Sequence, residues 1–535
     1  MGTPINMSII TRPRKFISGL LSDKGLTKKA YLNAFTVVLD YGAGLLVGVL
    51  ITPLMVAGLG NYLFGLWQVL VRLIGYLTPA SGRPAFALKA TLVNKQASID
   101  YDQKRRYVGT SLIIWLLFLP FLVCLGGILT WFVPYLLHVP TPYVWTARAV
   151  SGLLVFTFIF GALSSIPQVI LQGENLEYKR MGMSVVLIFA SGAFTWLALY
   201  LNTGIVGIAA AGVVSTFVSG LFYFWVVGTH TPWFGAAMPL HVEIREMLRL
   251  SVWFMGWNLV TSLLLSGDVV VLGLLNSVYS VTNYTLTKYV PETLIGIIVI
   301  IVFGIMPGLG SIVGTGEYGR AIRLRDEINS FIWLAATVFG ASVLIWNRVF
   351  MGLWVGADHF AGSIPNLLIV VAAMQLAFIR SDGNVIDLTL RMSQKVLLGL
   401  LSVTVSIVAA FILVGYFNLG IVGLCLGTIG GRLIIGIGYP VLISRFLDDS
   451  ISSQIAHMLR PILVTILIFL AAMGVDRFFS IAVGTGIKGW IIFIIAAGIT
   501  GIVMLLVSFY SGLSGDQRRS MIRRVQAAIT TAESS

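Results

Sequence analysis

The chain has 535 residues, of which 57% are apolar and only 10% are charged, and its mean hydropathy is +0.94. Because a soluble domain carries roughly 25% charged residues, this composition excludes a soluble protein and predicts a polytopic membrane protein. The formal net charge of +14 is explained by basic residues gathered on the cytoplasmic side of a membrane, so we expect no nucleic-acid partner.

Motifs that carry catalytic chemistry are scarce in the sequence. The two cysteines lie in separate apolar stretches, and the five histidines form no HxxxH or HExxH pair. No glycine-rich phosphate-binding loop of the Walker type is present. The sequence therefore predicts no metal site, no cofactor and no ATP hydrolysis, and we expect a protein that is not an enzyme.

The predicted elements begin after a basic segment, residues 1–30, in which we expect no cleaved signal peptide. Apolar stretches then recur along the chain, each near the roughly 20 residues that a helix needs to cross the hydrocarbon. They predict an all-α polytopic membrane protein with about 14 transmembrane helices. The predicted spans are residues 31–57, 64–82, 108–133, 147–171, 183–201, 205–228, 250–275, 282–307, 328–346, 364–385, 397–416, 420–443, 461–475 and 490–511.

The basic residues fix the expected orientation of these spans. When alternate connections are assigned to opposite sides, one set, which includes both termini, holds 27 of the 35 Lys and Arg residues, and the other set holds four. Cytoplasmic connections of membrane proteins are enriched in Lys and Arg, so both termini are predicted to be cytoplasmic. The final segment, residues 512–535, is basic and amphipathic and is expected to lie on anionic membrane lipids.

A short sequence occurs twice, 216 positions apart. "NTGIVGIAAAGVVS" covers Asn202–Ser215, and "NLGIVGLCLGTIGG" covers Asn418–Gly431. Turn chemistry alone explains part of the likeness, because Asn and Gly tolerate the positive φ that tight turns need. The same offset, however, also relates Arg72 to Lys288, which are two of only four cations in the interior of predicted spans, since Arg148 lies at the very start of its span.

The repeat predicts two six-helix lobes related by a parallel pseudo-twofold axis. Six is an even number, so each lobe begins and ends on the same side, and transporters with such repeats bind substrate at the repeat interface near mid-membrane. We expect, in chain order, a basic N-terminal segment 1–30, an N-lobe 31–228, a cytoplasmic linker 229–249, a C-lobe 250–443, an appendix of two further helices 444–511 and a basic amphipathic tail 512–535.

Four cations within the spans are candidate ligands for an anionic substrate. A charge is costly at this depth and is kept where it faces a cavity, a partner or a membrane surface. Arg72 either lines a cavity or forms an ion pair, for which Asp40 is a candidate. Lys288 either faces substrate or pairs with Glu292, four residues later. The other two cations are Arg380, which faces the cavity or extends to the cytoplasmic surface, and Arg432, which follows two glycines.

Three acids are candidate coupling sites for H⁺ or Na⁺. Asp268, in "LLLSGDVVVLGLL", is surrounded by apolar residues and is either a coupling site or the counter-ion of Lys288 or Arg432. Asp40 lies in the first predicted span, and Glu292 lies one turn after Lys288. The sequence leaves both interpretations of Asp268 open.

Four segments resemble a known family of membrane transporters. They are "AGLGNYLFGLWQVLVRLIGYLTPASG" (57–82), "IPQVILQGENLEYKR" (166–180), "SGDVVVLGLLNSVYSVTNYTL" (266–286) and "LGIVGLCLGTIGGRL" (419–433). With two six-span lobes and two extra spans, they resemble the multidrug/oligosaccharidyl-lipid/polysaccharide (MOP) exporter superfamily, and within it the polysaccharide flippase branch. The chain departs from that branch in "PASGRPAFALKA", which lacks the acid of an expected D-x-G segment.

The resemblance implies a secondary-active flippase of the bacterial cytoplasmic (inner) membrane. Its cargo would be a polyprenyl-diphosphate-linked oligosaccharide repeat unit for surface polysaccharide, with H⁺ or Na⁺ as coupling ion and a polysaccharide polymerase as a candidate partner. The alternative is a drug or cation antiporter of the same superfamily, which would use Asp40 and Asp268. A membrane glycosyltransferase is disfavoured, because the connections on the far side are too short to build a catalytic domain.

Overall fold

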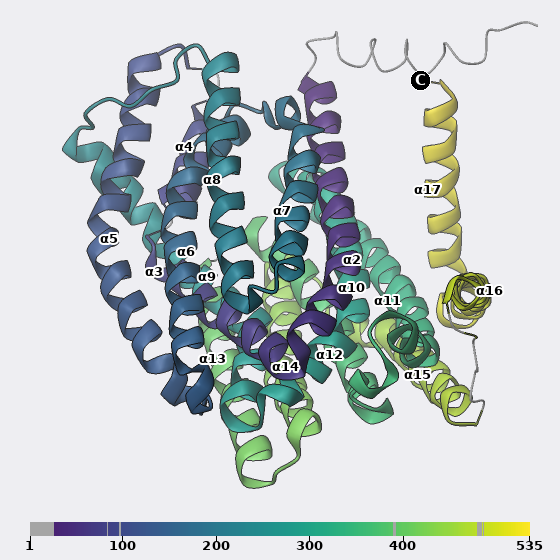
Figure 1. Ribbon diagram of the computed structural model, residues 1–535. Coiled ribbons are helices and arrows are strands. Elements are labelled where there is room, and N and C mark those ends of the chain that lie inside the picture. The colour runs from purple at the N-terminus through teal and green to yellow at the C-terminus, as the bar shows by residue number, and fades with distance from the viewer. Residues whose placement is uncertain are drawn as a thin grey trace, which may run out of the picture. The chain divides into compact units, whose positions relative to one another are not determined.

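The computed structural model describes residues 26–82, 84–95, 98–388, 392–478, 484 and 486–534, and every regular element in these ranges is a helix (Figure 1). The all-α prediction is confirmed. Most of the expected basic N-terminal segment lies outside the described residues.

Helices suit this apolar chain because in lipid each backbone N–H and C=O must find its partner within the protein. The bounds are α2 Leu26–Gly75, α3 Leu77–Ala80, α4 Pro84–Asn94, α5 Tyr101–Leu136, η1 Thr141–Tyr143, α6 Val144–Gly173, η2 Glu177–Arg180, α7 Met183–Tyr200, α8 Gly204–His230, α9 His241–Leu275, α10 Val278–Gly314, α11 Tyr318–Trp354, η3 Ala357–His359, α12 Ser363–Leu388, α13 Met392–Phe411, η4 Ile412–Tyr416, α14 Gly420–Leu447, α15 Ile451–Phe478, α16 Gly486–Gly512 and α17 Gly515–Ser534.

Thirteen helical stretches of the described chain are long and apolar enough to cross a membrane. The first, Phe35–Ala80, has 46 residues. At about 1.5 Å per residue it is roughly twice as long as the hydrocarbon core is thick. Gly60 interrupts it with a φ of 72° and a ψ of 170°, a backbone conformation that glycine adopts readily. The two sides of this kink correspond to the predicted spans 31–57 and 64–82. When this stretch is counted as two spans, the thirteen stretches agree with the predicted number of about 14.

The described chain forms two compact units, each assembled from separate stretches. Unit 1 contains the chain up to Thr52, Ala80–Leu125 and Leu153–Phe254. Unit 2 contains Pro53–Pro79, Gly126–Gly152 and the chain from Met255 onward. The lobe bounds expected from the repeat stay a prediction.

Unit 1 is held together by apolar packing and by ion pairs at one end of its helices. Leu88 of α4, Ile114 of α5, Ile170 of α6 and Val227 of α8 are fully buried in a common cluster. Close to this cluster, the Lys104 ammonium of α5 lies 2.8 Å from a carboxylate oxygen of Glu174, just after α6.

Unit 2 contains the larger core. Ile298 of α10, Ile332 of α11, Ala377 of α12 and Ile435 of α14 are buried together at its centre. A second cluster joins α11 and α12 to α15. The amphipathic tail predicted for residues 512–535 is largely the helix α17, where Gln517 donates a hydrogen bond of 3.1 Å to the Ser330 hydroxyl of α11.

The repeated sequence has repeated local geometry. Asn202 and Asn418 have φ values of 52° and 53°, and Gly204 and Gly420 have φ values of 62° and 52°. These turns start α8 at Gly204 and α14 at Gly420, which are 216 positions apart, like the sequence motif. The prediction that Asn and Gly supply positive φ in these turns is confirmed.

Candidate functional site

The part of α2 that follows its kink is fixed against the start of α10. A Cβ atom placed on Gly65 would lie 2.1 Å from the carbonyl oxygen of Val278, so only glycine permits this approach. The Thr282 hydroxyl of α10 donates a 2.6 Å hydrogen bond to the carbonyl of Asn61. This packing brings Arg72, on α2, to the same cavity as Lys288 of α10.

That cavity has a volume of about 230 Å³ and lies within unit 2. Its wall combines apolar side chains with an unusual number of charged ones. Six of the seven site residues predicted from the sequence line it, from helices α2, α9, α10, α12 and α14. They are Arg72, Asp268, Lys288, Glu292, Arg380 and Arg432.

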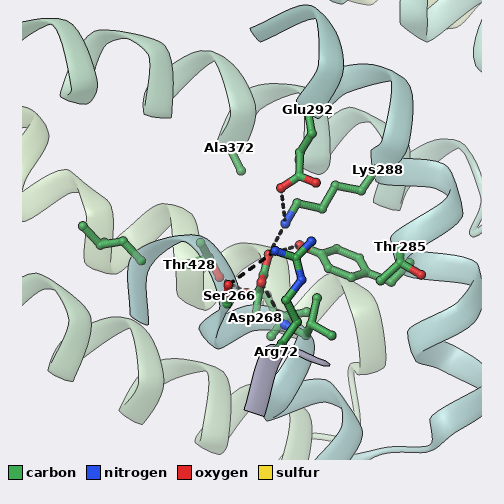
Figure 2. A network of polar contacts seen from close by, with 12 residues as sticks. Arg72, Ser266, Asp268, Thr285, Lys288, Glu292, Ala372 and Thr428 are labelled. Atoms are coloured by element: carbon green, nitrogen blue, oxygen red, sulfur yellow. Dashed lines mark hydrogen bonds and ion pairs between the residues drawn. The ribbon is translucent and has the colours of Figure 1, made fainter. Parts of the chain in front are cut away.

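Lys288 lies between two carboxylates. Its Nζ atom is 2.6 Å from Asp268 Oδ2 and 2.9 Å from Glu292 Oε1, and Figure 2 shows the ammonium between the two acids. The Tyr284 hydroxyl also donates to Asp268 Oδ2, at 2.6 Å. The interpretations of Glu292 as a partner of Lys288 and of Asp268 as its counter-ion are therefore confirmed, whereas their role in ion coupling stays a prediction.

The two acids differ in their access to water. The side chain of Asp268 is only 4% exposed, and that of Glu292 is 40% exposed. A solvent-accessible carboxylate can exchange its partner without opening the core. Glu292 is thus the member of this cluster that can leave Lys288 most easily.

Arg72 and Arg380 have no carboxylate partner among the described residues. Arg72 Nη1 lies 3.5 Å from the Ser266 hydroxyl, its one hydrogen-bond partner in the described part of the chain, and Figure 2 shows this contact as a dashed line. Arg380 is exposed on the cavity wall. Both guanidinium groups can therefore accept an anion without first losing a salt bridge.

Arg432 is buried and bound mainly to backbone. It is 5% exposed; its Nη1 donates to the carbonyl of Ala372 on α12 at 3.2 Å, and its Nη2 donates to the carbonyl of Leu264 on α9 at 2.5 Å. Gly431 beside it allows α14 to touch the backbone of Ser406 on α13. Arg432 therefore links α14 to α12 and α9. It contributes positive charge to the cavity, whereas both of its Nη atoms already donate to backbone.

Asp40, the seventh predicted residue, belongs to unit 1. Its Oδ2 atom lies 2.9 Å from Arg180 Nη1, and its Oδ1 atom accepts a 2.5 Å hydrogen bond from Ser184. Arg180 Nη2 also lies 2.6 Å from Glu177. Asp40 thus has its own cationic partner, which sequence reasoning missed.

Arg180 was missed because it lies in a predicted cytoplasmic connection, where a basic residue needs no further explanation. It is in fact only 6% exposed. Burial by itself would lower the pKa of Arg180, but the contacts with Glu177 and Asp40 outweigh burial and raise it. The guanidinium group therefore stays charged.

Two more ion pairs in unit 2, each with a buried cation, escaped the sequence analysis. Arg325 of α11 contacts Asp382 of α12 with Nε at 3.0 Å and Nη2 at 2.9 Å. Lys395 Nζ lies 2.7 Å from Asp387 and 3.7 Å above the ring of Trp257. No sequence spacing connects these partners. The described residues contain no group of three or more His, Cys, Asp and Glu that could hold a metal ion.

The central part of the chain matches a known family. Residues 143–311 match the family described as "Polysaccharide biosynthesis protein". This match covers less than half of the chain. None of the curated proteins matches the chain by sequence.

Solved transporter structures share the fold over most of the chain. The lipid II flippase MurJ, in an inward closed conformation, is 12% identical, with a TM-score of 0.62 over 90% of this chain and 98% of its own. An inward-facing multidrug MATE transporter of the MOP superfamily is 16% identical, with a TM-score of 0.56 over 81% and 98%. A MOP transporter from Pyrococcus furiosus is 16% identical, with a TM-score of 0.52 over 79% and 97%. The chain is thus a multi-pass membrane protein with the fold of MOP-superfamily transporters.

Proposed function

We propose that this chain, which has the fold of MOP-superfamily transporters, is a flippase for polyprenyl-diphosphate-linked oligosaccharides. It would move repeat units across the bacterial cytoplasmic membrane for surface polysaccharide synthesis, with both termini in the cytoplasm. The observation that carries the proposal is the net positive cavity of unit 2, where Arg72 and Arg380 have no carboxylate partner within the described chain. The family match to polysaccharide biosynthesis proteins supports the class of cargo.

The charge of the cavity suits a diphosphate that is esterified at both ends. Four cations and two carboxylates line the wall, which leaves two excess positive charges. A doubly esterified diphosphate carries two negative charges near neutral pH, so the loaded cavity would be close to neutral. A neutral complex avoids the large cost of an uncompensated charge within the membrane.

The available donors also suit phosphate. A guanidinium group binds phosphate oxygens in a bidentate manner, and its donors are pre-arranged in a plane. Arg72 and Arg380 would make the first contacts. Lys288 would join only after Glu292 releases it, and Arg432 would act through its charge while it holds three helices together.

This order of events provides a route to coupling. Protonation of Glu292 would free the Lys288 ammonium for phosphate and would give the loaded cavity one net positive charge, and loss of that proton would remove this charge, restore the ion pair and release the cargo. Cargo binding and proton binding would then assist each other at one end of the transport cycle. Asp268, buried and bonded to Tyr284, would keep the lysine aligned throughout.

The alternative is a drug or cation antiporter; one of the similar structures is named as a multidrug resistance transporter. A cationic drug needs a cavity with net negative charge. The cavity of unit 2 has the opposite sign. Resistance profiles in a host without its own drug pumps would separate the two functions.

The test compares Arg72→Gln and Arg380→Gln with the control Arg348→Gln, whose arginine is exposed and lies away from this cavity. Each lost charge-assisted hydrogen bond is worth about 1.5–3 kcal/mol, so the affinity of the purified protein for inorganic pyrophosphate should fall roughly ten- to hundredfold. Surface polysaccharide in a complemented deletion strain should fall in parallel. Full export by the Arg72→Gln/Arg380→Gln double variant would refute the diphosphate site.

A further inference from the structure

A second cavity, of about 300 Å³, lies within unit 1 and is not explained by a diphosphate site. It is bounded by α6, α7 and α8, and Asp40 of α2 closes part of its wall. Its size falls at the lower end of small-molecule sites, which are about 300–1,000 Å³. Unlike the cavity of unit 2, it is lined mainly by neutral polar side chains.

These polar side chains lie on one face of each helix. On α6, Ser164 and Gln168 are four residues apart, and on α8, Ser219 and Tyr223 have the same spacing. Residues spaced in this way share one face of a helix. Ser191 of α7 completes the set. Since polar groups facing lipid are costly, their convergence on one cavity indicates a wet or liganded space.

The side chains of Ser164, Gln168, Ser191 and Ser219 have no hydrogen-bond partner in the part of the chain that the structure describes, and all four are partly exposed. Each can offer both a donor and an acceptor. Other hydroxyls of these helices bond to their own backbone, as Thr216 does to the carbonyl of Gly212. The cavity therefore presents unused neutral donors and acceptors.

The charges at the wall are already compensated. Both oxygens of Asp40 are occupied, one by Arg180 at 2.9 Å and the other by Ser184 at 2.5 Å. Arg180 is only 6% exposed, and its Nε atom is buried without a partner among the described residues. A metal cation would have to displace Arg180 to reach Asp40, whereas a neutral ligand would leave this pair intact.

We infer that this cavity binds a neutral, hydroxyl-rich ligand, namely a sugar residue. A pyranose carries several hydroxyl groups, each of which is a donor and an acceptor, and it matches the unused groups of three helices. The Tyr223 ring supplies one aromatic surface in the same cavity. The inference rests on the proposed function only for the source of the sugar, which would be the oligosaccharide of the cargo.

The experiment measures binding of free sugars to the full chain in lipid nanodiscs, because maltoside detergents carry a sugar of their own. The probes are glucose, galactose, mannose and N-acetylglucosamine, detected by saturation-transfer-difference NMR. Affinities for single residues should be in the millimolar range. The variant Ser191→Leu, which fills the cavity, should abolish the signal of the bound sugar, and Ser164→Ala and Ser219→Ala should each weaken binding about three- to tenfold.

Two controls keep the result interpretable. Thr157→Val on α6 is a matched control, because its hydroxyl bonds to the carbonyl of Leu153 and does not line the cavity. Arg72→Gln should keep sugar binding but lose pyrophosphate, whereas Ser191→Leu should keep pyrophosphate. Failure of this inference is thereby distinguishable from failure of the proposed function.

Three results would overturn the inference. One is the absence of a signal with every probe in a preparation that binds pyrophosphate. Another is a sugar signal that persists unchanged in Ser191→Leu. The third is a wild-type protein that binds no sugar but is stabilised by Na⁺, with this stabilisation lost in Asp40→Asn, because that result would identify a cation site.

The source of the sugar is tested by surface polysaccharide export in the Ser191→Leu variant. If this variant loses both sugar binding and export, the sugar belongs to the cargo. If it loses sugar binding but keeps export, the ligand is a free saccharide.

Discussion

The cluster of Lys288, Asp268 and Glu292 predicts an asymmetric response to charge removal. The Lys288–Asp268 contact of 2.6 Å corresponds to about 6 kcal/mol of Coulomb attraction at an effective dielectric constant of about 20. Much of this attraction only offsets the cost of burying the two charges. What a mutation measures is therefore the cost of leaving one charge behind.

Lys288→Met leaves Asp268, whose side chain is 4% exposed, with the Tyr284 hydroxyl as its remaining side-chain partner in the described chain. We expect a loss of about 3–5 kcal/mol in the free energy of unfolding. Asp268→Asn leaves Lys288 with Glu292 at 2.9 Å, so we expect a smaller loss of about 1–3 kcal/mol. The double variant removes both charges of this pair and should be more stable than the sum of the single losses predicts.

The measurement is reversible unfolding in mixed micelles during a titration with sodium dodecyl sulfate. Wild type, both single variants and the double variant form a double-mutant cycle, and the exposed Arg348→Gln serves as a control that should change little. Additivity of the single effects within about 0.5 kcal/mol would show that the two charges are not coupled. An Asp268→Asn loss larger than that of Lys288→Met would also contradict the reasoning, because Glu292 would then contribute nothing.

Three further predictions concern the same cavity, the helix packing and the orientation. Glu292→Gln releases the lysine ammonium from one of its two partners and should raise the affinity for inorganic pyrophosphate severalfold in calorimetry; an unchanged or weaker affinity would exclude competition between this carboxylate and the ligand. Gly65→Val places a side chain within 2.1 Å of the Val278 carbonyl and should reduce the yield of monodisperse protein in size-exclusion chromatography, so a wild-type yield would show that the two helices need not approach. Green fluorescent protein fused after Ser535 should be fluorescent, and alkaline phosphatase fused at the same place should be inactive, because both termini are predicted to be cytoplasmic. A dark green fluorescent protein fusion with an active phosphatase fusion would show that the C-terminus lies on the opposite side.

The helical class and the number of spans followed from apolar runs and from the distribution of charge. The sequence also predicted the turns at Asn202 and Asn418, because positive φ restricts the residue type. The sequence did not show that two predicted spans form one helix, α2, with a kink at Gly60. Glycine is common within membrane helices, so its presence does not mark a kink.

The partners of the charged residues were harder to predict. The pair of Lys288 and Glu292 could be expected, because residues four apart share a helix face. Asp40 and Arg180 are 140 positions apart, and Arg325 and Asp382 are 57 apart; neither separation has a local signature. The hydroxyls of the second cavity, too, are ordinary serines in apolar helices until three helices bring them together.

Two properties were determined by the sequence alone. They are the helical class and the approximate positions of the spans, because the cost of exposing backbone or charge to lipid is local and can be read from the order of residues. Only the tertiary structure decided which cations, such as Arg72 and Arg380, lack a carboxylate partner among the described residues. The reason is physical: pairing depends on distances of a few ångströms between side chains from different helices, and helix packing sets these distances.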